Sequence, residues 1–228
     1  MYNVLLYTQN KDGDFVLSNE SNVKTLRKGD NLFRDAEFTT WKTPLDCLDS
    51  GVSMFYNSSL IEWKTDLPNL INGENMFTYS DLTSFHSALP LLSNGTKMLA
   101  NTPLSAFSED MPFLLNGSYM FQNSKIEHYS SYTKRLTNGK GMFKGCTNLS
   151  EFIGSLESLE IGEEMFNGCI LNASSVAFIA DTIKKYPKNA VSGWFAKIPF
   201  KSLTISLFSS NWSSKTNRTT IIGIQENK

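Results

Sequence analysis

The chain has 228 residues, a formal net charge of −1, 19% charged side chains and 40% hydrophobic ones. The near-neutral balance provides no electrostatic attraction for nucleic acid or for an anionic membrane surface. The hydrophobic content is typical of a folded chain and not of a disordered one. We therefore expect a folded protein with no nucleic acid as partner and no membrane insertion.

Residues 1–28 precede the regular part of the chain and predict an N-terminal β-hairpin cap. Two β-prone runs, residues 2–7 and 15–17, flank a polar segment that contains a glycine, as in hairpins. Val23 and Leu26 then begin the apolar spacing of the following repeats. A cap would cover the open edge and the apolar cross-section that the first turn of a stacked structure exposes.

Residues 29–171 repeat one pattern, and a glycine opens each copy. The interval between these glycines is 22 residues five times and 23 residues once. A period of this length indicates one small unit stacked on its own copies, because a single unit cannot bury its apolar side. The predicted fold class is mainly β with short helical caps, as a solenoid of about seven 22-residue repeats. The opening glycines are Gly29, Gly51, Gly73, Gly95, Gly117, Gly139 and Gly162.

The third and fourth residues after each glycine form two columns of large apolar side chains. Because this spacing does not change, we interpret both columns as a structural ladder in the core, although methionine is also a soft, adaptable ligand-binding side chain. Leu32 and Phe33 open the columns, and Leu99 once replaces phenylalanine. The other members of the ladder are Met54, Phe55, Met76, Phe77, Met98, Met120, Phe121, Met142, Phe143, Met165 and Phe166.

Four further apolar columns run through the unit, and Thr133 is the polar exception among them. Equivalent side chains are expected to stack about 4.8 Å apart where neighbouring units pair as strands. Asparagine precedes the glycine in four copies, and Asn-Gly tolerates a positive φ, so a tight turn is predicted there. These asparagines are Asn72, Asn94, Asn116 and Asn138.

The repeated pattern is clearest at residues 139–159, which contain Met142-Phe143-Lys144-Gly145-Cys146. In this pattern the chain resembles the BspA-type leucine-rich repeat, a family of bacterial surface proteins and of tail or other virion proteins of phages that infect gut bacteria. The resemblance covers about residues 29–171. It departs from the common pattern in having Met where Ala often precedes Phe, and in having the Gly-Cys pair in only two copies. The resemblance implies the fold and says little about function, since the motif residues are core residues.

Beyond the repeats, residues 172–189 predict a C-terminal capping helix. Val176, Ile179 and Ala180 recur at helical spacing, after residues that favour a helix N-terminus and before a proline that would end the helix.

Residues 190–228 do not follow the repeat pattern and predict a β-rich C-terminal extension, interpreted as an attachment element. Its candidate partner-binding residues are Trp194, Phe195, Phe200 and Phe208, because a free tail would not keep so much apolar surface in water.

The residue types that carry chemistry are sparse and scattered along the sequence. His86 and His128, the two histidines, stand at different repeat positions in units two apart, so no metal pair is expected. Cys146 and Cys169 share one repeat position and predict stacked buried thiols, while Cys47 is a lone thiol. We therefore predict no catalytic residue, no metal site and no cofactor.

Two groups of surface residues are candidate functional sites. Glu62, Glu127 and Glu151 fall on or near outward strand positions, where some β-solenoids carry glycan-cleaving carboxylates. They belong to different units, so a solvated polar surface is the preferred interpretation. A second group of exposed tyrosines could form a surface that binds a sugar or a protein. These are Tyr56, Tyr79, Tyr119 and Tyr132.

Together these features favour a non-enzymatic phage virion protein with a structural or host-recognition (adhesion) role. The expected partners are other virion proteins, copies of the chain itself, and a host surface glycan or protein. Residues 1–7 lack the basic start and the long apolar core of an export signal, which favours the virion over the bacterial cell surface as location. The alternatives are a BspA-like surface adhesin of a bacterium and a glycan-processing enzyme on a β-solenoid.

Overall fold

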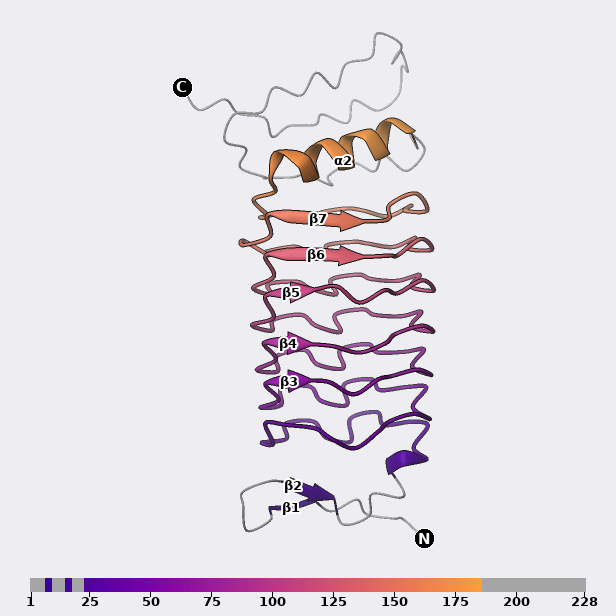
Figure 1. Cartoon of the computed structure of the whole chain (residues 1–228), viewed down its shortest axis with the longest axis vertical. Helices are drawn as coiled ribbons and strands as arrows, with labels where there is room; N and C mark the ends of the chain where they lie inside the picture. Colours follow the sequence, from indigo (N-terminus) through magenta and orange to yellow (C-terminus); the bar gives the residue numbers. More distant parts are fainter. Residues whose placement is uncertain (1–6, 10–14, 18–22, 186–228) are drawn as a thin grey trace.

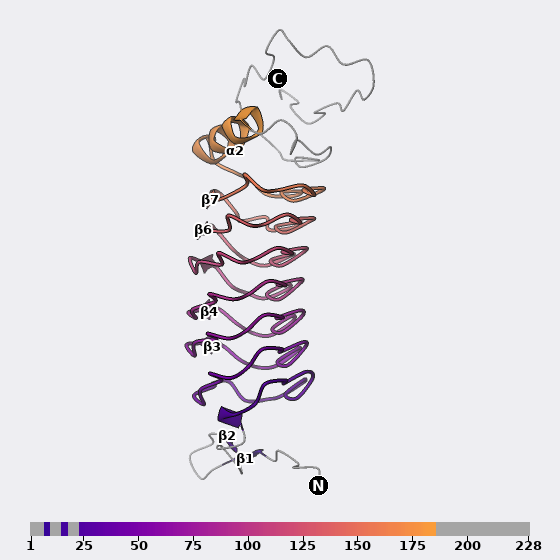
Figure 2. The same cartoon turned by 90° about the vertical axis from the view of Figure 1, so that its right-hand side faces the viewer.

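The computed structural model describes residues 7–9, 15–17 and 23–185 (Figure 1). Short parallel strands and turns make up most of this part of the chain, with little helix, as predicted. The chain passes repeatedly around one axis, and each passage lies on the one before it (Figures 1 and 2). We call these passages coils and number them by their opening glycines, so that coil 1 is residues 29–50 and coil 6 is residues 139–161.

Five short strands lie one above another along one side of the stack. They pair in parallel: β3 with β4, β5 with β6, and β6 with β7. The register joins residues 22 or 23 apart, such as Trp63 to Phe85 and Tyr129 to Phe152. The register therefore follows the glycine spacing. The strands are β3 (Glu62–Trp63), β4 (Ser84–Phe85), β5 (Ala106–Phe107), β6 (His128–Ser131) and β7 (Glu151–Gly154).

A second line of parallel bridges joins the coils at the residue before each opening glycine, from Lys28 with Ser50 up to Asn138 with Ile161. Backbone hydrogen bonds continue from there around the turn. The N–H groups of Ser53 and Phe55 donate to the carbonyl oxygens of Glu74 and Met76 in the next coil, at 2.9 and 2.8 Å. Each coil thus satisfies its backbone through its neighbours, which is why one repeat cannot fold alone.

The core between these two lines of bridges consists of stacked equivalent side chains. Phe121 and Phe143 have ring centroids 5.4 Å apart with rings inclined by 2°, and Phe143 and Phe166 are 5.6 Å apart. Such offset stacks fit the coil spacing and add to the burial of apolar area. All the residues named above as the ladder after Leu32 and Phe33 are fully buried: Met54, Phe55, Met76, Phe77, Met98, Met120, Phe121, Met142, Phe143, Met165 and Phe166.

Leu32 is a correction to the ladder, because its side chain is 37% exposed. The methionine at this repeat position packs onto the opening glycine of the preceding coil. A β-carbon on Gly51, for example, would lie 2.9 Å from the Sδ of Met76. Coil 1 has no such coil before it, so Leu32 has no glycine to pack on.

The structure also corrects the prediction that the Asn-Gly pairs form a turn with positive φ. Asn72, Asn94 and the glycines after them do not have positive φ; the left-handed residues stand two and six places after each opening glycine. The asparagine acts through its side chain: Oδ1 of Asn94 accepts a hydrogen bond from the N–H of Thr96 at 3.1 Å, which closes an Asx turn. The left-handed residues are Asn31, Asp35, Ser53, Asn57, Asn75, Tyr79, Lys97, Asn101, Tyr119, Asn123, Gly141, Gly145, Glu164 and Gly168.

The two ends of the stack carry different elements. Strands β1 (Tyr7–Gln9) and β2 (Phe15–Leu17) form an antiparallel pair near the first coil, and helix α2 (Ala173–Lys185) lies over the last (Figure 2). The side chain of Asn172 caps the helix by accepting the N–H of Ser175 at 2.8 Å. The hydroxyl of Ser175 in turn accepts the N–H of Phe152 in β7 at 2.8 Å, so the helix satisfies a donor at the edge of the last strand.

Candidate interaction surface

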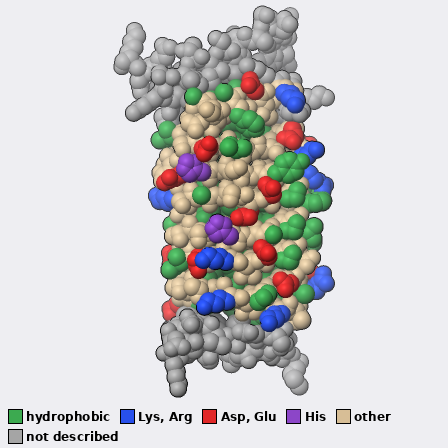
Figure 3. Space-filling view, in the orientation of Figure 1, with side chains coloured by type: hydrophobic (Ala, Val, Ile, Leu, Met, Phe, Trp, Pro, Cys, Tyr) green, Lys and Arg blue, Asp and Glu red, His purple; other side chains and the backbone are tan. Residues whose placement is uncertain are grey.

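The outward side of the stacked strands is the first candidate site, and we call it the strand face. Side chains alternate along the strands: on β4, for example, Phe85 points inward and is buried, and its neighbour Ser84 points outward. The outward residues differ from coil to coil and are mostly polar (Figure 3). Those aligned on the strands are Glu62, Ser84, Ala106, His128 and Glu151.

Both histidines lie on the strand face and each one joins two coils. Nδ1 of His86 lies 3.5 Å from a carboxylate oxygen of Glu109, and Nδ1 of His128 lies 3.0 Å from one of Glu151. The histidines therefore have separate partners and do not converge. In the part of the chain that the structure describes, no group of three His, Cys, Asp or Glu side chains is placed to hold a metal ion.

The three candidate carboxylates do not form one site. Glu62 on β3 pairs with Lys64 at 2.8 Å, whereas Glu151 on β7 pairs with His128 on β6. Glu127 lies one coil below Glu151 but one residue out of register, because the register aligns His128 with Glu151. The stack thus separates Glu62 from the other two by several coils.

A shallow hollow of about 250 Å³ opens on the strand face between coils 1 and 2. Its polar lining comes from Thr40, Lys42, Glu62, Lys64 and Thr65, and Trp41 also lines it. Two ammonium groups, one carboxylate and two hydroxyls can donate to and accept from a polar ligand such as a sugar. The hollow is small, so it would hold a single sugar or side chain.

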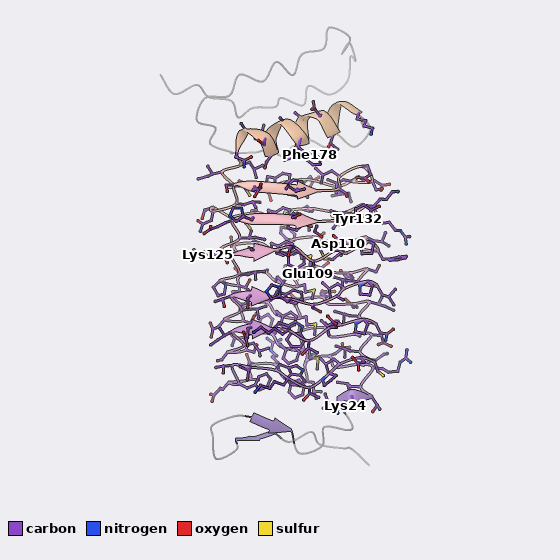
Figure 4. All side chains as sticks on the ribbon, in the orientation of Figure 1. Lys24, Glu109, Asp110, Lys125, Tyr132 and Phe178 are labelled. Carbon is purple, nitrogen blue, oxygen red and sulfur yellow. The ribbon has the colours of Figure 1, made fainter. Side chains whose placement is uncertain are left out.

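The structure divides the four candidate tyrosines between two sides of the stack. Tyr56 and Tyr79 contact each other with ring centroids 5.6 Å apart, and the guanidinium of Arg34 lies 4.1 Å above the Tyr56 ring. Tyr132 lies beside Asp110 at the end of the strands (Figure 4), where its N–H donates to Oδ1 of Asp110 at 2.8 Å. Tyr119 is half-buried in a turn. The four tyrosines therefore do not form one continuous surface.

Cys146 and Cys169 are buried and not bonded to each other. Burial raises the pKa of the Cys146 thiol to about 12, and burial also raises the pKa of Cys169. Each thiol donates to a backbone carbonyl of the coil below, Cys146 to Phe121 at 2.9 Å and Cys169 to Phe143 at 3.2 Å. Their role is structural, because a protonated thiol is a poor nucleophile. Cys47 is exposed.

A further exposed surface lies where the chain turns after the strands, and sequence reasoning missed it. We call it the proline corner. It consists of the side chains 17, 18 and 20 residues after each opening glycine in coils 1 to 5. In coil 6, which is one residue longer, the equivalent positions come one residue later, and before coil 1 they come 22 residues before those of coil 1. In coils 2 to 4 seven of its nine side chains are apolar, with a proline in every coil, and the other two are Asn69 and Ser93. The sequence feature that could have predicted it is the recurrence of proline and other apolar residues beside the buried leucine column in three consecutive copies. Its apolar members are Pro68, Ile71, Pro90, Leu91, Pro112, Phe113 and Leu115.

The described chain is thus a stack of coils with repeated core columns and a varied outer surface. Residues 113–210 match the model of the BspA type leucine rich repeat region, in six copies. The chain is thus similar to these regions over less than half of its length, and the similarity indicates a protein-interaction or adhesion repeat. The chain matches neither a curated protein nor a solved structure.

Trp194, Phe195, Phe200 and Phe208 lie outside the described residues, and so does the whole predicted attachment element. Among the described residues, no helix combines the length and apolar character needed to cross a membrane.

Proposed function

We propose that the chain is a leucine-rich-repeat solenoid of about seven 22-residue repeats that acts by recognition and not by catalysis. Its role is structural or host-recognition (adhesion) in a phage virion, and the alternative is a BspA-like adhesin on a bacterial surface. One observation carries the proposal. The buried columns repeat the same residue types in every coil, whereas the outward residues of the strand face change from coil to coil.

This contrast supports recognition because a repeat stack offers an extended, rigid surface on which exposed side chains can vary without disturbing the core. The strand face presents hydroxyls, both histidines and Tyr132, groups that bind sugars and proteins through hydrogen bonds and planar contacts. The hollow between Lys42 and Lys64 adds a polar recess on the same face. A host surface glycan or protein is the partner that this surface suits.

The proposal is tested by binding of the full, fluorescently labelled chain to whole gut bacteria and to arrays of their surface glycans. We expect saturable binding that falls at least about tenfold in the double variant Lys42→Ala/Lys64→Ala or in Tyr132→Ala, as for central contact residues. Lys125→Ala is the matched control, since Lys125 is exposed at the opposite end of the strands from Tyr132 (Figure 4). Equal binding by all of these variants would remove the strand face as the recognition surface.

The location has its own test, because a virion and a bacterial surface leave different traces. We expect peptides of this chain in purified phage particles, detected by mass spectrometry after removal of soluble protein. Peptides released instead by protease treatment of intact bacteria would favour the BspA-like adhesin. Glycan cleavage by the purified chain, lost in Glu127→Gln, would favour the enzymatic alternative over both.

A further inference from the structure

The proline corner is an exposed apolar feature of the described chain that the strand face does not include. Leu91 is 40% exposed, Phe113 45% and Ile71 50%, and all three belong to consecutive coils. Prolines at the neighbouring positions stiffen the corner and remove backbone donors. Contiguous exposed apolar residues of this kind mark interaction surfaces more often than singly exposed ones do.

Charged side chains border the apolar part on both ends, and their order is regular. Two coils below Leu91 stands Asp46, and two coils above it stands Lys134. One step further out, Lys24 lies below and Glu157 lies above. From the bottom of the stack to the top, the position 17 residues after the glycine therefore holds a positive charge, a negative charge, three prolines, a positive charge and a negative charge.

This order is complementary to its own reverse. Reversing the column places Lys24 against Glu157 and Asp46 against Lys134, so both pairs combine opposite charges. In the column 20 residues after the glycine, the reversal brings Arg27 to Glu160 and aligns Ile71 with Leu115, while Asp49 meets Thr137. The parallel alternative would oppose each charge to an identical one, which is unfavourable.

We propose that two copies of the chain associate through the proline corner as an antiparallel dimer, with the twofold axis passing near Leu91. In a twofold interface the same surface meets itself, so residue i of one copy contacts residue j of the other and j contacts i. The apolar coils 2 to 4 form the centre, and the charged residues form a polar rim, as in ordinary interfaces. From Lys24 to Glu157 the corner spans seven levels, about 29 Å at the spacing of parallel strands.

A second copy fits this surface better than an unrelated partner. A charge order that is complementary to its own reverse favours contact with a second copy of the same surface in antiparallel orientation. Arg27, which pairs with Asp49 of its own chain at 3.0 Å, keeps its side chain 77% exposed and can also reach Glu160 of a second copy. The dimer extends the proposal that copies of the chain are partners, and it does not depend on the adhesive role. The dimer presents two strand faces, one from each copy.

The mass in solution tests the association. Sedimentation equilibrium of the full chain should give twice 25.6 kDa. The variant Leu91→Arg places two guanidinium groups together at the axis and should sediment as a monomer. Ile153→Arg is the control, because Ile153 is 55% exposed on the strand face and its substitution should leave the dimer intact. Circular dichroism melting checks that both variants fold.

Charge reversal tests the antiparallel geometry. Asp46→Lys alone and Lys134→Asp alone should each weaken the dimer about tenfold, since each creates two like-charge contacts. The double variant Asp46→Lys/Lys134→Asp restores opposite charges and should recover the affinity of the unsubstituted chain. Loss in both single variants with recovery in the double variant is specific to a twofold that opposes these two positions.

Crosslinking gives a direct readout of the axis. In a Cys47→Ser background, Leu91→Cys should form a disulfide between copies under mild oxidation, and Ile153→Cys should not. Cys146 and Cys169 are buried and do not compete. A monomeric chain, a dimer unaffected by Leu91→Arg, or a double charge variant as weak as the single ones would overturn the proposal. None of these results bears on cell binding by the strand face, so the two proposals fail separately.

Discussion

The α-carbon of Gly51 faces the thioether of Met76 in the next coil, so closely that a β-carbon on Gly51 would lie 2.9 Å from Sδ and 3.1 Å from Cε. The same contact recurs between Gly73 and Met98. The opening glycine of a coil and the methionine 25 residues later therefore form one packing unit. The glycine serves close approach of a side chain and not an unusual backbone angle.

This packing predicts that Gly73→Ala destabilises the chain by about 1 to 3 kcal/mol through overpacking against Met98. Met98 is fully buried and can yield only by disturbing its neighbours. Thermal unfolding followed by circular dichroism measures the cost. In a double-mutant cycle, Met98→Ala should make the additional cost of Gly73→Ala disappear, because the smaller side chain leaves room for the new methyl. Strict additivity of the two substitutions would contradict the contact.

A carboxylate in the ladder should unfold the chain. Phe121 is fully buried between Phe143 and its neighbours, so Phe121→Asp would bury a charge at a cost of several kcal/mol, comparable to the stability of a whole domain. The adjacent Gln122 is half-buried in the turn, and Gln122→Ala is expected to change stability little. Urea unfolding of the two variants provides the comparison. Similar midpoints would show that the ladder does not hold the fold together.

The contact between helix α2 and the last strand should contribute measurably to stability. Ser175→Ala removes the acceptor for the Phe152 N–H, which is buried, and should cost about 1 to 3 kcal/mol. The matched control is Ser174→Ala, since Ser174 is exposed on the same helix turn. Amide hydrogen exchange should also become faster in β7 of the first variant. Unchanged exchange at Phe152 would mean that this hydrogen bond does not protect the end of the stack.

The buried thiols predict how stability depends on pH. Burial raises the pKa of Cys146 to about 12, whereas an unfolded thiol ionises near pH 8.5. Between these values the unfolded state releases a proton that the folded state keeps, so stability should fall as the pH rises from about 9 towards 12. Cys169 acts in the same direction.

Measuring the free energy of unfolding against pH tests this expectation, with the double variant Cys146→Ser/Cys169→Ser as the reference. Serine suits the position because Ser80 and Thr102 stand at the same repeat position in other coils and donate to backbone carbonyls at 2.8 and 2.9 Å. The variant should lose part of the alkaline decline. A thiol reagent should modify Cys47 alone in the folded chain, and rapid modification of the other two would refute their burial.

The sequence by itself determined the register and the content of the core. Glycines 22 residues apart place residue i beneath residue i + 22, and the parallel pairing of Trp63 with Phe85 follows that interval. The apolar columns could be read directly, because a position occupied by a large apolar residue in every copy is expected to be buried wherever coils stack on both sides of it. Thr133 is likewise buried, as one polar member of an apolar column.

Only the tertiary structure decided what lies outside the columns and at the ends of the stack. Leu32 belongs to an apolar column, yet it is exposed because no coil precedes it, and no local pattern reveals a missing neighbour. Positive φ falls at Ser53 and Asn57 and not at Asn-Gly, since the N–H groups of the turn must reach carbonyls one coil away. The proline corner emerged for the same reason: which apolar residues face water depends on how the coils pack against each other.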